Sequence, residues 1–356
     1  MASKLCPHIQ VLDGKTLDAI SQLRPPMVKT MDLNRHTLQA IRSAAPNTLI
    51  VARRFVNSQD YADPLQTGTS YANSYQDVLD LVNVVEVYNE AISSSTAKAD
   101  LELFDTFQGV FAYRIWDMNP NVKVGLFCLP TGNLGYAGEP KLTDFPKSMA
   151  LPKNKVFICV HEYSWFTWDW QSPARCLRYR QQMAGLSGYQ ALITECGLTQ
   201  GVVTGRPDLG WRSGIPRNAF VEGARWYDSE LMKDSYIVGA ALFTCGTSFG
   251  WDTFECTAEW VEAATGAPPS EPAPPKPQPQ ETLEQYVRRV SWDKVGVNYN
   301  PDAAFVRYAR QNGLGKPESQ EFDVMYSNLA YRIQAYTLAI VLCPAGQWDM
   351  VRHISW

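Results

Sequence analysis

The sequence predicts a (β/α)₈ barrel, followed by a proline-rich linker and a small, mainly helical C-terminal domain. Short β-branched segments alternate with helical segments, and eight such strands fit into residues 1–265, which is the usual size of such a barrel. Residues 266–281 are dominated by proline, which is typical of a semi-rigid linker. Residues 282–356 then form the accessory domain.

The elements follow one another in a regular order. The strands are expected at residues 9–12, 27–32, 48–55, 84–90, 122–128, 155–160, 191–197 and 237–245. The helices are expected at 16–23, 35–44, 75–82, 97–119, 174–183, 218–233 and 254–264, with a polar loop at 57–69 and two further helices at 283–290 and 301–311. An open doubly wound sheet is the competing fold. It has no support, because the sequence contains neither a dinucleotide-binding glycine motif after the first strand nor a P-loop.

Charge and composition exclude several classes of function. The net charge of −4 gives no basic face for nucleic acid, and no apolar run reaches the ~18 residues of a membrane span. The eight cysteines lack metal-ligand spacing, so we expect mostly reduced, structural thiols. We also expect no metal, no organic cofactor and a monomeric protein. Residues 1–8 lack a signal peptide's apolar region. The chain is then cytoplasmic, or secreted or directed to a cell wall if a signal has been removed.

Two expected strands end in a carboxylate. Glu90 closes the run at 84–90, and Glu195 lies in the run at 191–197. Parallel barrels build their chemistry at the C-terminal ends of their strands. Retaining glycoside hydrolysis needs two carboxyl groups about 5–5.5 Å apart. A lone Glu after a strand is more often a helix N-terminal charge or a solvated loop residue. The hypothesis that Glu90 and Glu195 form an acid/base and nucleophile pair therefore depends on both carboxylates together.

The same strand ends carry further polar and aromatic side chains in a characteristic order. These are Asn89 beside Glu90 after the fourth strand, His161 and Tyr163 after the sixth, Glu195 after the seventh and Trp251 after the eighth. This pattern resembles the clan A retaining glycoside hydrolases, which include cellulase- and mannanase-like enzymes. The resemblance covers residues 1–265 and assigns no family within the clan.

The resemblance implies a role for each matching position near the two carboxylates. Glu90 would be the general acid/base and Glu195 the nucleophile. Asn89 would hydrogen-bond the substrate 2-hydroxyl, and Tyr163 would donate to the nucleophile. His161 would line the same subsite near Glu90.

Other substrate contacts follow from the resemblance or from composition. Trp251 would form the platform beneath the sugar at the cleavage point. Arg53 or Arg54 resembles the clan's arginine that orients the nucleophile, although the pair falls on the third expected strand, whereas the clan usually has this arginine on the second. Trp165 begins an aromatic run at 165–170 that would form a sugar-stacking wall or pack in the core. His8 has no partner in sequence and is interpreted as structural.

These observations predict a retaining β-glycoside hydrolase that acts within a polysaccharide chain and has carbohydrate as its partner. A bacterial cell-wall glycan is the alternative substrate. From a different class of function, the alternative is a carbohydrate-binding or structural barrel without turnover. The aromatic residues of 282–356 either make that domain's core or form a wall- or glycan-binding module. Tethering such a module to the barrel raises the effective concentration at an insoluble substrate.

Overall fold

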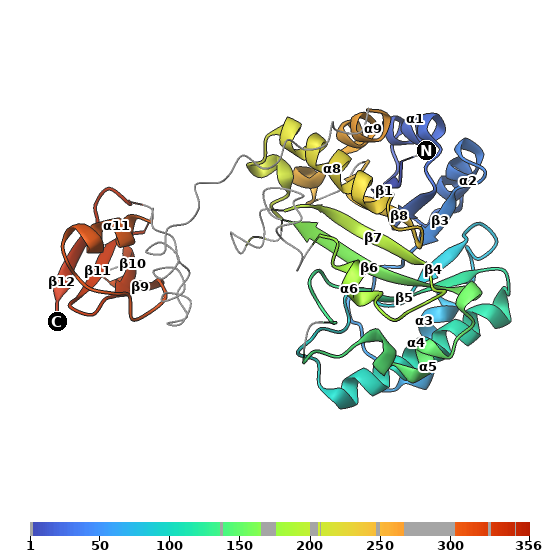
Figure 1. The fold of residues 1–356 in the computed structure, drawn as a ribbon, viewed down its shortest axis with the longest axis horizontal. Coiled ribbons are helices and arrows are strands. Elements are labelled where there is room, and N and C mark those ends of the chain that lie inside the picture. The colour runs from blue at the N-terminus through green and yellow to red at the C-terminus, as the bar shows by residue number, and fades with distance from the viewer. Residues whose placement is uncertain are drawn as a thin grey trace. The chain divides into compact units, whose positions relative to one another are not determined.

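The computed structural model describes residues 3–135, 138–164, 176–199, 206, 208–246, 250–266, 303–326, 329–345 and 347–356. The chain divides into two compact units, Met1–Ser270 and Glu271–Trp356 (Figure 1). Within the described residues, every helix is too short or too polar to cross a membrane.

The first unit is a closed barrel of eight strands, each parallel to its neighbours (Figure 1). The strands are β1 (Leu5–Ile9), β2 (Met27–Thr30), β3 (Leu49–Ala52), β4 (Val84–Glu86), β5 (Lys123–Leu129), β6 (Val156–Ser164), β7 (Ala191–Leu198) and β8 (Ile237–Cys245). They follow the order of the chain, and β1 closes the barrel by pairing with β8. The expected barrel is therefore confirmed.

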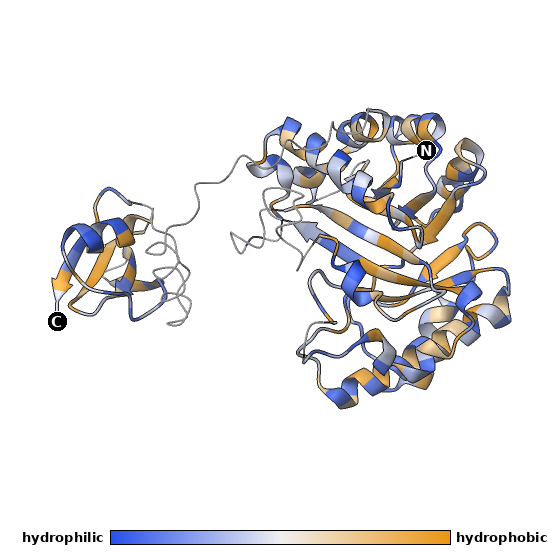
Figure 2. Cartoon of the chain, viewed as in Figure 1, coloured by the Kyte–Doolittle hydropathy of each residue, from blue (hydrophilic) through white to orange (hydrophobic). Residues whose placement is uncertain are grey.

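Helices between the strands surround the barrel (Figure 1). They are α1 (Gly14–Leu23), α2 (Arg35–Ala44), α3 (Pro64–Asn73), α4 (Lys98–Met118), α5 (Pro146–Met149), α6 (Tyr179–Gln182), α8 (Arg217–Leu231) and α9 (Thr257–Thr265), with 3₁₀ turns η1 (Leu142–Asp144), η2 (Lys153–Lys155), η3 (Trp211–Ser213) and η4 (Asp252–Phe254). Apolar residues concentrate on the strands (Figure 2). Strands covered on both faces read as continuous apolar runs, and this made them visible in the sequence.

Two expected barrel helices are wrong in position or length. Residues 75–81 form turns, and the helix is α3, which begins inside the expected loop and ends at Asn73. Its start has a local signal, because the Asp63 side chain accepts the Gln66 N–H and Pro64 occupies the first turn. The helix expected at 174–183 is reduced to α6 among the described residues of that stretch.

The second unit contains α11 (Ala304–Gln311) and a four-stranded antiparallel sheet. Its strands are β9 (Phe322–Tyr326), β10 (Leu329–Ala335), β11 (Ala339–Pro344) and β12 (Arg352–Ser355), in the order β12-β11-β10-β9. The expectation of a mainly helical domain is wrong. Its core packs one face of α11, including Phe305, against sheet residues such as Val341 and Cys343. The helix expected at 283–290, and the linker at 266–281 apart from Gly266, lie outside the described residues.

Candidate active site

A cleft of about 920 Å³ opens at the C-terminal ends of the barrel strands. Its volume falls within the ~300–1,000 Å³ of typical ligand sites. Both candidate carboxylates line it. The other lining residues are Gln10, Met31, Arg53, Arg54, Phe55, Val56, Gln59, Asn89, Pro130, Thr131, Tyr163, Thr199, Phe243, Trp251 and Phe254.

Glu195 lies within β7, buried in the floor of this cleft. Arg53 donates from Nη1 to Glu195 Oε1 at 2.7 Å, and the Tyr163 hydroxyl donates to Oε2 at 3.0 Å. Thr131 Oγ1 in turn accepts the backbone N–H of Tyr163 at 3.0 Å, which fixes that residue beside the carboxylate. Each oxygen of Glu195 thus has one strong donor.

These surroundings keep Glu195 ionised. Burial by itself would raise the pKa of Glu195, but electrostatic interactions with His161 and Arg53 lower this pKa well below its usual range. Burial also raises the pKa of Tyr163 well above its ordinary value, so this phenol stays a neutral donor. A buried carboxylate that stays charged, and is held by donors on both oxygens, has the properties of a positioned nucleophile.

Glu90 lies in the segment after β4, with its side chain 38% exposed at the cleft. Its Oε1 is hydrogen-bonded to His161 Nδ1 at 2.7 Å, and that nitrogen lies 3.8 Å from Glu195 Oε2. The two carboxylate oxygens are therefore no further apart than the sum of these distances. This upper limit on the oxygen–oxygen distance equals the shortest separation of inverting pairs, ~6.5–9.5 Å. The ~5–5.5 Å of retaining pairs lies below it.

The two arginines after β3 diverge, as strand alternation requires. Arg53 is buried and donates to both Glu195 Oε1 and Asn89 Oδ1. Arg54 also lines the cleft, but its guanidinium pairs with the exposed carboxylate of Asp77. Strand β1 pairs with both β2 and β8, so the strand count stands, and Arg53 reaches the carboxylate from the third strand.

An aromatic wall stands on the β8 side of the cleft. Trp251 packs edge-on against Phe243, with ring centroids 5.4 Å apart, and against Phe254 at 5.5 Å. All three rings line the cleft. Phe55 is 77% exposed and also lines it. Trp165, the other expected stacking residue, lies outside the described residues.

His8, interpreted as structural from the sequence, is a buried residue beside Glu195. His8 lies on β1 with its Nε2 3.7 Å from Glu195 Oε1. Burial lowers the pKa of His8 well below its usual value, so its imidazole is neutral. The strand expected at 9–12 began too late to include His8, and a correct start at Leu5 would have placed it on a barrel strand.

A third carboxylate near this end, Glu162, points away from the cleft. Its two oxygens accept the backbone N–H groups of Leu177 and Tyr179, at 3.0 and 2.9 Å, and the Tyr227 hydroxyl. Burial raises the pKa of Glu162 to about 7. These contacts tie the segment after β6 to α8, and they give Glu162 a structural role.

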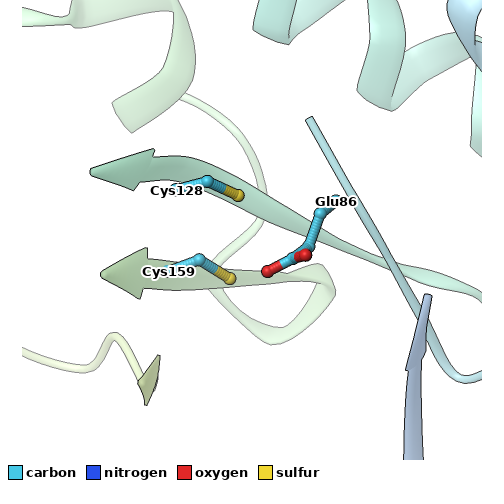
Figure 3. A group of neighbouring side chains, drawn as sticks. All are labelled: Glu86, Cys128 and Cys159. Carbon is cyan, nitrogen blue, oxygen red and sulfur yellow. The ribbon is translucent and has the colours of Figure 1, made fainter. Parts of the chain in front are cut away.

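A group of possible metal ligands lies in the barrel interior. Glu86, Cys128 and Cys159 are buried, and their ligand atoms lie within 4.8 Å of one another (Figure 3). The Glu86 carboxylate, however, already forms an ion pair with the buried ammonium of Lys29. Burial raises the pKa of the Cys128 thiol well above its ordinary value, so this sulfur stays protonated. The group is therefore a buried ion pair beside two cysteines, and its carboxylate is already paired with a cation.

No protein-family model matches the sequence, and no curated protein matches it. Solved structures with similar folds include a glucosidase from Croceicoccus marinus, at 14% identity over 70% of this chain and 62% of that chain, with a TM-score of 0.47. They also include a family 39 glycoside hydrolase from Bacteroides cellulosilyticus WH2 (10% identity, 96% and 70% coverage, TM-score 0.48). A GH128 (subgroup II) endo-β-1,3-glucanase from Pseudomonas viridiflava is similar at 12% identity, 74% and 98% coverage and a TM-score of 0.44.

The strand pairing of the first unit makes it a TIM barrel. These matches to glycoside hydrolases, all with TM-scores below 0.5, assign no family to the chain. The chain spans 62% of the length of the Croceicoccus glucosidase chain.

Proposed function

We propose that the chain is a retaining β-glycoside hydrolase that cleaves within a polysaccharide, with Glu90 as acid/base and Glu195 as nucleophile. One observation carries the proposal. Two carboxylates of one cleft both approach a single nitrogen, His161 Nδ1, at 2.7 and 3.8 Å. One is buried and held ionised, and the other is partly exposed. Acid/base and nucleophile roles need this difference in environment.

The reaction proceeds in two displacements. In the first, a Glu195 oxygen attacks the anomeric carbon while Glu90 gives its proton to the departing glycosidic oxygen, and a covalent glycosyl ester forms. In the second, Glu90 takes a proton from water, whose oxygen attacks the same carbon and releases Glu195 as carboxylate. Two inversions return the product with its original anomeric configuration.

The neighbouring side chains support these steps. Arg53 and Tyr163 aim the carboxylate of Glu195 and restrain its rotation, because each of its oxygens accepts one hydrogen bond. Asn89, held by Arg53, stands next to Glu90 at the cleft and would meet the substrate 2-hydroxyl. Trp251 would supply a flat apolar face for the sugar ring.

A panel of polysaccharides tests the proposal. It should contain β-glucans, mannan, xylan and purified bacterial cell wall, with product sizing and ¹H NMR of the anomer formed first. We expect hydrolysis of at least one member with retained configuration, and its loss in Glu90→Gln and Glu195→Gln. An inverted first product would contradict the double displacement. Binding without turnover across the panel would favour the carbohydrate-binding barrel.

A further inference from the structure

Strand β5 contains a bulge close to Glu90. Leu126 pairs with Ile158 and Leu129 with Val160, so β5 has one more residue than β6 between these pairs. The residues in the bulge, Phe127 and Cys128, have φ angles of +73° and +44°. Residues other than glycine rarely adopt this left-handed conformation, so neighbouring groups must hold the bulge in place.

The bulge is hydrogen-bonded to the backbone of Glu90. The N–H of Glu90 donates to the carbonyl oxygen of Cys128 at 2.9 Å. Glu90 is itself in the left-handed region, at φ +51°. Because the carbonyl direction at Cys128 depends on the bulge, the bulge also determines where the Glu90 side chain begins.

A buried chain of polar groups holds the bulge from outside the barrel. The N–H of Phe127 donates to Gln108 Oε1 at 2.6 Å, and Gln108 Nε2 donates to Ser148 Oγ at 3.0 Å. The Ser148 hydroxyl donates to Asp105 Oδ1 at 2.6 Å. Gln108 and Ser148 are fully buried, and Asp105 is 3% exposed. This chain of hydrogen bonds leads from Asp105 on α4 to Ser148 on α5, back to Gln108 on α4, and on to Phe127 on β5.

We propose that Gln108 is a positioning residue for the proton donor Glu90. Its carbonyl holds the Phe127 N–H and thereby the bulge, and its amide N–H is fixed by Ser148. Only a side chain with both an acceptor and a donor can make both bonds at this place. The inference rests on the proposed function, because it assigns Glu90 the proton transfer that this alignment serves.

A purely structural role predicts a different result from a positioning role. If Gln108 only fastens α4 to β5, its loss lowers stability and leaves the relative rates on different substrates unchanged. If it aligns Glu90, its loss slows those reactions in which the leaving group needs a proton. The acidic phenol of an activated aryl glycoside leaves as its anion and does not need that proton. The leaving group of an alkyl or unsubstituted phenyl glycoside does need it.

The test measures kcat/KM, which reports the first displacement, on a 2,4-dinitrophenyl and a phenyl β-glycoside of the preferred sugar. For Gln108→Met we expect kcat/KM to fall about 10-fold or more on the phenyl glycoside and less than about 3-fold on the dinitrophenyl glycoside. General acid catalysis as a whole supplies ~10²–10⁴-fold, so misalignment of Glu90 can account for such a loss. Gln182→Met is the matched control. Gln182 is also buried in the barrel unit but donates to Asn133, so neither rate should change selectively. Equal losses on both glycosides, or no loss on either, would overturn the proposal.

Hydrogen exchange of the backbone provides a readout that does not depend on turnover. In Gln108→Met we expect faster exchange in peptides that contain Glu90 and Phe127, and in Gln182→Met no change there. Unchanged exchange would overturn the inference even if no substrate were cleaved, while faster exchange without any turnover would refute only the proposed function. If Gln108→Met fails to fold, Ser148→Ala is the second variant. It keeps the Gln108 amide but removes the hydroxyl that accepts from it, and it should cause the same selective loss of kcat/KM and the same faster exchange.

Discussion

Replacing Tyr163 with phenylalanine tests how the buried nucleophile keeps its charge. The change removes one oxygen, which lies 3.0 Å from Glu195 Oε2 in a partly buried setting, and leaves the ring in place. A hydrogen bond to a charged group contributes about 1.5–3 kcal/mol, and 1.36 kcal/mol corresponds to one pKa unit. The pKa of Glu195 should therefore rise by about 1–2 units in Tyr163→Phe.

The assay is the pH dependence of kcat/KM, whose acid limb follows protonation of essential groups in the free enzyme. Below that limb Glu195 is protonated and cannot attack, so a raised pKa should move the limb about 1–2 pH units upward. Tyr189→Phe is the matched control, because the Tyr189 hydroxyl donates instead to the Met149 carbonyl at 2.7 Å. An acid limb at the same pH in both variants and in the unchanged protein would refute this explanation.

Three further changes are expected to act on separate parts of the chain. Arg53→Met removes a cation from Glu195, so the acid limb should rise by about 1–3 pH units while kcat/KM falls; a limb that stays in place would count against the ion pair. Gly125→Ala places a Cβ 2.6 Å from a buried thiol sulfur and should cost about 1–3 kcal/mol in denaturant unfolding, whereas Gly109→Ala meets nothing within 4 Å and should not destabilise. Trp356, 71% exposed in the second unit, should contribute to binding of an insoluble glycan, so Trp356→Ala should reduce pull-down without changing rates on soluble substrate.

Most of the barrel could be predicted because its strands are covered on both faces. Runs such as 237–245 have no polar side to confuse their reading, and polar residues near the ends of several runs lie at the cleft, although Glu162 does not. Glu90, Glu195 and Tyr163 all line this one cleft. Strand alternation also anticipated that only one of the two arginines would face inward, but not which one.

The failures arise where tertiary contacts decide the local structure. The C-terminal sheet was missed because its strands carry many polar residues, and the apolar run before Pro344 fits a strand or a helix equally well. The Lys29–Glu86 ion pair breaks the apolar pattern of the barrel interior, and only the closed fold brings the two residues together. The bulge held by Gln108 leaves no local signal, since it depends on a side chain from another element.

Covalent trapping reports directly on whether Glu195 is the nucleophile. An activated 2-deoxy-2-fluoro β-glycoside forms the glycosyl ester quickly and hydrolyses it slowly, so the intermediate accumulates for mass spectrometry. If Glu195 is the nucleophile, we expect one added fluorosugar per chain, located on the peptide that contains Glu195, and no addition in Glu195→Gln. Absence of label with gluco, manno, galacto and xylo donors, or a label on Glu90, would contradict a retaining mechanism with Glu195 as nucleophile.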